Sequence, residues 1–145
     1  MTAPENVYEI DIAATPERIW DAITDPQQTR QYFYGALSKS DWTVGSRWTS
    51  ESEEGEVYLD GEILEIDPPR RLVHTLRVVQ DPIAAAEAPS TVEWQITPMG
   101  DKCRLTMTHT GRGPATIEYT SGGWNTILGG LKELLETGSG VGAAM

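Results

Sequence analysis

Cysteine and phenylalanine are almost absent from this sequence, which contains one of each. A single cysteine cannot form an intrachain disulfide, so we expect Cys103 to be a small core residue. No apolar run is long enough to cross a membrane, and the N-terminus lacks the basic and apolar regions of a secretory signal. We therefore expect a cytoplasmic protein without membrane insertion.

Basic residues are also scarce: 11 Lys and Arg stand against 22 Asp and Glu, for a formal net charge of −11. This charge repels phosphate backbones, which argues against a nucleic-acid partner. Eight carboxylates and no Lys or Arg fall within residues 51–67 (Glu51, Glu53, Glu54, Glu56, Asp60, Glu62, Glu65 and Asp67). The segment is interpreted either as a docking face for a basic partner or as a solvated strand edge that discourages edge-to-edge pairing.

Recognisable catalytic and cofactor motifs are missing. There is no nucleophile elbow, no paired-cysteine or HExxH metal pattern and no P-loop, so no metal and no cofactor is predicted. Two glycine-rich segments, 111–114 and 121–123, match no nucleotide fingerprint. The second lies at the N-terminus of a predicted helix, where an anion can bind.

A length of 145 residues indicates one domain. Alternating apolar and polar residues predict a strand at 7–12, and Thr15-Pro16-Glu17 and Asp25-Pro26 are typical starts of two short helices, the second of which is predicted to run to about Tyr32. Further strands are predicted at 37–42, 46–53, 57–66, 72–79, 91–98 and 103–110. The connection 80–90 contains a predicted helical turn and is a candidate lid.

The end of the chain changes to helical spacing, which predicts a long amphipathic helix from about Tyr119 to Thr137. We expect a single domain at 1–138 and a flexible tail at 139–145. The order predicts an α+β fold in which a curved antiparallel sheet of about seven strands wraps around the last helix. A cavity forms between helix and sheet wherever side chains do not fill the space.

Several segments together resemble a known family. They are Thr15–Trp20, Val44–Trp48, Asp67–Val73, Leu105–Gly111 and Gly123–Gly138. They resemble the START-like (SRPBCC) superfamily and, within it, the homologues of the activator of the 90-kDa heat-shock protein ATPase. The resemblance implies the helix-grip fold of START-like and Bet v-like proteins, with the two short helices closing one end of the cavity.

Strand parity places both histidines on core faces, beside Leu76 and Met107. If one strand lies between them, the rings of His74 and His109 are roughly 10 Å apart, too far to pair but close enough for one ligand to touch both. Each is interpreted as a hydrogen-bonded core residue, a ligand contact or an acid–base group. The candidate catalytic residues are His109, His74, Tyr119 and Tyr58.

Five Trp and five Tyr suit a pocket that holds a mostly apolar molecule and orients it. Trp94 and Trp124 are expected on the cavity walls. The candidate ligand contacts are Trp48, Tyr58, His74, Leu76, Trp94, Met107, His109, Tyr119, Trp124, Leu128, Phe33 and Tyr34. Arg47 and Arg77 are interpreted as ligand carboxylate partners or as solvated surface residues.

Three functions remain open at this point. The first is binding of a small hydrophobic or amphipathic ligand, such as a lipid, polyketide or aromatic metabolite. The second is an enzyme of the polyketide cyclase or aromatase kind, and the third is a protein that interacts with a chaperone or other protein partner. The sequence leaves open whether the protein is a monomer or a homodimer.

Overall fold

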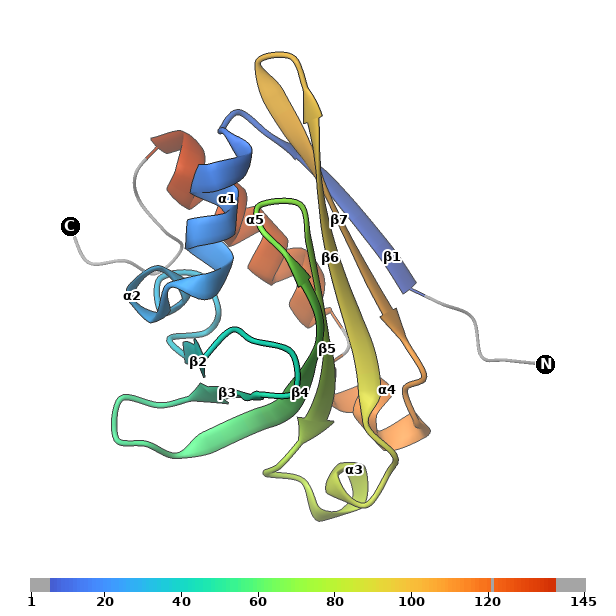
Figure 1. The fold of residues 1–145 in the computed structure, drawn as a ribbon. Helices are drawn as coiled ribbons and strands as arrows, with labels where there is room; N and C mark the ends of the chain where they lie inside the picture. Colours follow the sequence, from blue (N-terminus) through green and yellow to red (C-terminus); the bar gives the residue numbers. More distant parts are fainter. Residues whose placement is uncertain (1–5, 121, 138–145) are drawn as a thin grey trace.

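A seven-stranded antiparallel sheet curves around a C-terminal helix in the computed structural model, which describes residues 6–120 and 122–137 (Figure 1). The spatial order of the strands is β1-β7-β6-β5-β4-β3-β2. The strands are β1 (Asn6–Ile12), β2 (Leu37–Ser40), β3 (Arg47–Glu51), β4 (Val57–Asp67), β5 (Arg71–Val78), β6 (Ser90–Met99) and β7 (Lys102–Thr110). The predicted α+β helix-grip architecture is confirmed.

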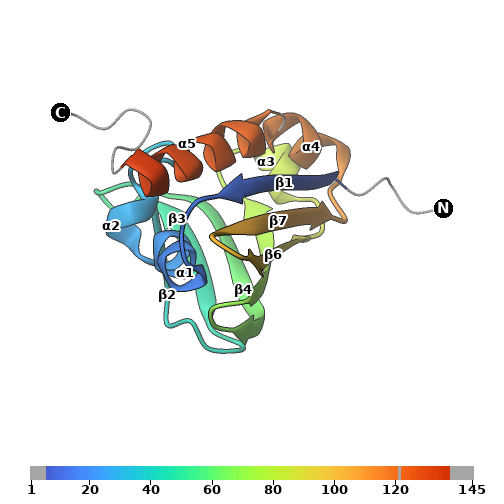
Figure 2. The same ribbon diagram turned by 90° about the horizontal axis from the view of Figure 1, so that it is seen from above.

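The helices are α1 (Pro16–Thr24), α2 (Pro26–Thr29), α3 (Pro82–Ala85), α4 (Pro114–Thr120) and α5 (Gly123–Thr137). Thr15 caps α1 as predicted, accepting a hydrogen bond from the Arg18 N–H at 3.2 Å. Asp25 caps α2 in the same way. In Figure 2, α5 and α4 lie along one face of the sheet, and α5 contacts the edge strand β1.

The C-terminal helix differs from its prediction. Periodicity predicts one helix from about Tyr119, whereas the structure has the separate helix α4 and starts α5 at Gly123. Gly122, with φ of +76°, makes the break, because a left-handed backbone cannot continue an α-helix. Three other elements are shorter than predicted: α2 ends at Thr29, β3 ends at Glu51, and a positive φ at Trp42 keeps that residue out of β2.

The core lies between the concave face of the sheet and α5. The apolar stripe of α5 is buried (Trp124, Ile127, Leu128, Leu131, Leu134 and Leu135), and it belongs to one core cluster with inward-facing residues of strands β3 to β7. Cys103 is buried, as expected. The predicted domain end at residue 138 and the predicted flexible tail lie outside the described residues.

The acidic segment is not a sheet edge, which corrects one of the two interpretations of its sequence. Residues 57–67 form β4, which pairs with β3 on one side and β5 on the other, while the sheet edges are β1 and β2. Five of its carboxylates form ion pairs (Glu51, Glu53, Asp60, Glu65 and Asp67). Among the described residues, Glu54, Glu56 and Glu62 form none, and all three are exposed.

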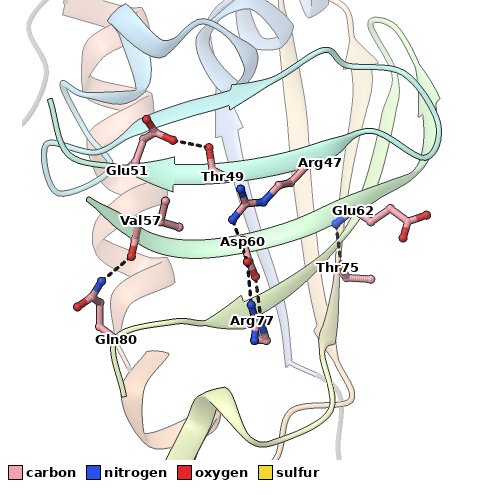
Figure 3. Close-up of polar contacts among 9 residues, drawn as sticks. All are labelled: Arg47, Thr49, Glu51, Val57, Asp60, Glu62, Thr75, Arg77 and Gln80. Carbon is pink, nitrogen blue, oxygen red and sulfur yellow. Dashed lines mark hydrogen bonds and ion pairs between the residues drawn. The ribbon is translucent and has the colours of Figure 1, made fainter. Parts of the chain in front are cut away.

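Arg47 and Arg77 bind a carboxylate of this acidic segment, Asp60, and do not line the cavity described below. Figure 3 shows both guanidinium groups converging on Asp60, with Arg77 donating at 3.1 and 3.0 Å and Arg47 at 3.2 Å. The paired arginines hold the pKa of Asp60 below its usual value, mainly through the Arg77 hydrogen bonds. The two residues are therefore structural partners of a carboxylate in the protein itself.

Candidate functional site

A cavity of about 350 Å³ lies between the sheet and helices α4 and α5. Its lining residues come from the segment after α2, from strands β3 to β5 and from both helices (Phe33, Tyr34, Ala36, Ser50, Tyr58, Leu59, Leu76, Tyr119, Thr120, Gly123, Trp124 and Ile127). The volume is within the range of small-molecule sites. The gap between helix and sheet is therefore only partly filled by the protein's own side chains.

The cavity has an aromatic inner wall and an exposed aromatic mouth. Phe33 packs edge-on against Trp124, with ring centroids 5.9 Å apart. Tyr34 and Tyr119 also line the cavity, yet 66% of Tyr34 and 47% of Tyr119 is exposed, so both reach the surface. Helices α1 and α2 contribute no lining residue; the resemblance implied that they close one end.

Apart from the Trp124 indole N–H, which donates to His109, the polar side-chain groups of the lining are hydroxyls. They belong to Ser50, Thr120 and the three tyrosines, while none of the lining residues carries a formal charge at neutral pH. An apolar wall with a few hydroxyls suits a mostly apolar molecule with one or more oxygen atoms.

His74 is a buried, fully hydrogen-bonded residue of β5. Its Nδ1 lies 2.8 Å from the Thr75 carbonyl oxygen, and its Nε2 accepts the indole N–H of Trp94 at 3.1 Å. A carbonyl can only accept, so the proton is on Nδ1 and the ring is neutral. Trp48 stacks on the ring, with centroids 4.3 Å apart.

His109 has the opposite tautomer. Its Nδ1 accepts the indole N–H of Trp124 at 2.9 Å, so Nε2 carries the proton and donates to Ser90 Oγ at 2.7 Å. Ser90 in turn donates to the carbonyl oxygen of Leu76 at 3.0 Å. Every ring nitrogen of both histidines therefore has a partner.

Burial keeps both rings neutral. Desolvation lowers the pKa of His74 to about 4. It lowers the pKa of His109 to about 3, with a further contribution from the positive charge of Arg112. Val92 of β6 pairs with both residues, so the two rings are separated by one strand, as predicted. At neutral pH neither ring has a free nitrogen with which to transfer a proton.

Six of the twelve candidate ligand contacts line the cavity: Phe33, Tyr34, Tyr58, Leu76, Tyr119 and Trp124. The other six do not: Trp48, His74, Trp94, Met107, His109 and Leu128. Trp48, His74 and Trp94 border a second void of only about 10 Å³, which has room for about one water molecule. Of the candidate catalytic residues, Tyr58 and Tyr119 lie at the cavity and the histidines lie behind its wall.

Sequence reasoning missed six lining residues: Ala36, Ser50, Leu59, Thr120, Gly123 and Ile127. Ile127 belongs to the predicted helical stripe, and alternation on β4 could have indicated Leu59. The sequence had no signal for Ala36 or Thr120, because α4 and the segment after α2 reach the cavity only through the tertiary fold. Among residues 6–120 and 122–137, no cluster of three or more His, Cys, Asp or Glu side chains could hold a metal ion.

A family model described as Activator of Hsp90 ATPase homolog 1-like protein matches residues 13–136. The chain belongs to this family. The match spans most of the sheet and α5, and it confirms the resemblance inferred from the short motifs. No curated protein sequence matches the chain significantly.

Solved structures share the fold of this family member. Protein MLL2253 from Mesorhizobium loti is 27% identical, with a TM-score of 0.76, and the alignment covers 92% of this chain and 97% of that one. An Aha1 dimer from Colwellia psychrerythraea is 18% identical, with a TM-score of 0.75 and coverage of 95% and 100%. An Hsp90 activator from Plasmodium falciparum is 22% identical, with a TM-score of 0.63 and coverage of 94% and 90%. In the part of the chain that the structure describes, no helix is long and apolar enough to span a membrane.

Proposed function

We propose that this protein binds a small, mostly apolar molecule in the cavity between the sheet and helices α4 and α5. The observation that carries the proposal is the cavity of about 350 Å³ that remains after Trp94 and Trp124 have packed. Tightly packed interiors rarely leave voids of this size. Aromatic walls and scattered hydroxyls favour an amphipathic ligand such as a lipid, polyketide or aromatic metabolite.

Binding is favoured over catalysis because the buried histidines are neutral and saturated with hydrogen bonds. A cyclase or aromatase would have to use Tyr58 and Tyr119, the candidate catalytic residues at the cavity. Neither has a hydrogen bond to a base among the described residues. The enzymatic hypothesis therefore has less support than simple binding.

Ser50 offers a direct test. It is almost completely buried and lines the cavity, and its hydroxyl forms no hydrogen bond with a described residue. Ser50→Leu should fill part of the cavity without breaking a contact. Thr97→Leu, which makes a comparable change at an exposed position of β6, is the matched control.

The measurement is a fluorescence titration with the neutral apolar probe N-phenyl-1-naphthylamine, together with native mass spectrometry of freshly purified protein. We expect saturable binding at one site, about tenfold or more weaker in Ser50→Leu and unchanged in Thr97→Leu. Absence of saturable binding in the unmodified protein, or equal affinity in all three proteins, would overturn the proposal.

A second candidate is interaction with a chaperone, supported by the family description and by the shared fold of the Plasmodium falciparum Hsp90 activator. Glu54 and Glu56, which are exposed and form no ion pair within the described part of the chain, are available for a basic surface. Glu54→Gln/Glu56→Gln should slow association with purified Hsp90, most clearly at low salt. Association at the same rate would exclude docking through these carboxylates.

The choice between a monomer and a homodimer, which the sequence leaves open, can be made by light scattering.

A further inference from the structure

Two buried serines differ from the other buried polar residues that the structure describes. Ser50 on β3 is 1% exposed and Ser38 on β2 is 3% exposed, and neither hydroxyl forms a hydrogen bond with a described residue. A buried hydroxyl without a partner is costly, because it gives up its hydrogen bonds to water and gains none in return. The remaining buried polar side chains each have at least one partner (Thr29, Thr49, Asp60, His74, Ser90, His109, Arg112 and Thr116).

Both serine hydroxyls face empty space. The two residues are directly opposite each other in the register of β2 and β3, so their side chains lie on the same face of the sheet. Ser38 borders the second void, where one water molecule can satisfy it, whereas Ser50 lines the large cavity. Within residues 6–120 and 122–137, the one fully enclosed side-chain nitrogen or oxygen without a partner is Nε of Arg71. The Ser50 hydroxyl is therefore not fully enclosed, and the group that satisfies it must occupy the cavity.

On the helix side of the cavity, the buried polar groups are already engaged. Thr120 donates its hydroxyl proton to the Thr116 carbonyl oxygen at 2.8 Å and accepts a hydrogen bond from Arg112 at 2.9 Å. The indole N–H of Trp124 donates to His109 at 2.9 Å. Away from the exposed mouth, the described residues of this side therefore offer the cavity no free side-chain donor.

The sheet side carries the free hydroxyls. The register of β3 and β4 shifts after Ser50, which pairs with Leu59, because Glu51 pairs with Val57. Tyr58 is the extra residue of this β-bulge, and it lines the cavity together with its neighbour Leu59. Regular alternation would send two neighbouring residues to opposite faces of the sheet, and a bulge redirects one of them. The bulge thus adds a second hydroxyl, without a hydrogen-bond partner among the described residues, to the wall that contains Ser50.

We infer that the ligand carries an uncharged oxygen, a carbonyl or a hydroxyl, at its buried end, and that this oxygen forms a hydrogen bond with Ser50. The apolar body of the ligand then lies against Phe33 and Trp124. The oxygen is uncharged because no lining residue carries a formal charge at neutral pH, so a buried carboxylate would have no counter-ion there. This inference rests on the proposed function, and it makes Ser50 the residue that selects the polar group of the ligand.

The test uses two neutral probes of nearly the same shape. 2-Acetylnaphthalene has a carbonyl oxygen where 2-isopropenylnaphthalene has a methylene carbon, so only the ketone can accept a hydrogen bond. Each probe displaces N-phenyl-1-naphthylamine from the unmodified protein and from Ser50→Ala. We expect Ser50→Ala to weaken binding of the ketone about fivefold or more and to leave binding of the hydrocarbon within about twofold. Binding of the hydrocarbon also reports that the variant is folded.

Ser38→Ala is the matched control, since it removes a buried hydroxyl directly opposite Ser50 that does not line the cavity. This variant should bind both probes as the unmodified protein does. A third probe, 2-naphthoate, tests the charge of the ligand. It should bind to the unmodified protein about tenfold or more weakly than the ketone, because its carboxylate must lose water without gaining a positive partner.

Three results would overturn the inference alone. They are an equal change for ketone and hydrocarbon in Ser50→Ala, the same selective loss of ketone binding in Ser38→Ala, and binding of 2-naphthoate as tight as that of the ketone. Binding of neither neutral probe to the unmodified protein would overturn the proposed function with it.

Discussion

The indole N–H of Trp124 on α5 donates to Nδ1 of His109 on β7 at 2.9 Å. The Trp94 indole makes the corresponding bond to His74, and the two indoles meet edge to face with centroids 5.7 Å apart. Two hydrogen bonds and the ring contact between the indoles therefore link β5 to the C-terminal helix through the core. They fix the position of α5 on the sheet and so help to define the cavity beside it.

Replacing either indole by phenylalanine should destabilise the protein. Trp94→Phe and Trp124→Phe each leave a buried histidine nitrogen without a donor, which costs about 1–3 kcal/mol in addition to the lost packing. Truncation to alanine should cost about 3–5 kcal/mol. Urea unfolding measures both effects. Trp20→Phe is the control, since Trp20 is partly exposed and its indole N–H has no hydrogen-bond partner among the described residues. A loss no larger than that of the control would mean that the bonds contribute nothing.

The two histidines should make stability depend on pH. Their folded-state pKa values of about 4 and about 3 lie below the ordinary value of 6.5. Between these values the imidazoles are protonated in the unfolded chain but neutral in the folded protein. The stability that the two neutral histidines contribute is fully present above about pH 6.5 and is lost as the pH falls toward their folded-state pKa values. With two protons taken up, the free energy of unfolding should fall by about 2.7 kcal/mol per pH unit near pH 5.5.

Urea unfolding at a series of pH values from about 7.5 to 4.5 measures this slope. His109→Gln should reduce the slope to about the value expected for the uptake of one proton. A flat profile over this range would show that the rings titrate in the folded protein as they do in the unfolded chain, which would contradict their burial as neutral groups. The carboxylates with lowered pKa values, such as Glu51, add to the slope as the pH approaches their ordinary value of 4.5, so the histidine slope is read between about pH 6.5 and 5.5.

Gly61 should not tolerate a side chain. A Cβ at this position would lie 1.9 Å from the carbonyl oxygen of Thr75, where β4 and β5 approach each other. Gly61→Ala must separate the strands and should cost about 1–3 kcal/mol or more. Gly129→Ala, on α5 where a Cβ meets nothing within 4 Å, should instead stabilise by about 0.5–1 kcal/mol. Equal melting temperatures for the two variants would contradict the observed strand approach.

Asp60→Asn should weaken the outer face of the sheet. The carboxylate is almost buried and accepts three hydrogen bonds from Arg47 and Arg77, whose own exposure to solvent moderates the loss to about 1 kcal/mol or slightly more. Glu62→Gln, two residues along the same strand and without an ion pair among the described residues, should change the free energy of unfolding by less than about 0.5 kcal/mol. A double-mutant cycle of Asp60→Asn with Arg77→Gln would isolate the pair; no coupling would refute this account.

The sequence predicted the fold well because its signals are local. Alternation on each strand, the Thr15 and Asp25 caps and the apolar stripe of α5 each act within a few residues. The break at Gly122 was not predicted, because helical periodicity continues across it. Strand parity also placed His74 and His109 on the core face correctly, since the direction of a side chain in a strand alternates regularly.

The sequence alone determined most of the element order, the strand faces and an antiparallel sheet wrapped around the last helix, because these follow from hydrophobic period and capping. Only the tertiary structure decided which inward-facing residues surround empty space and which fill it. His74 and Trp94 share a face with Leu76, but they are hydrogen-bonded to each other and lie in the packed core, whereas Leu76 lines the cavity. The cavity arises from distances between segments far apart in the chain, such as Ala36 and Thr120, and no local pattern encodes those distances.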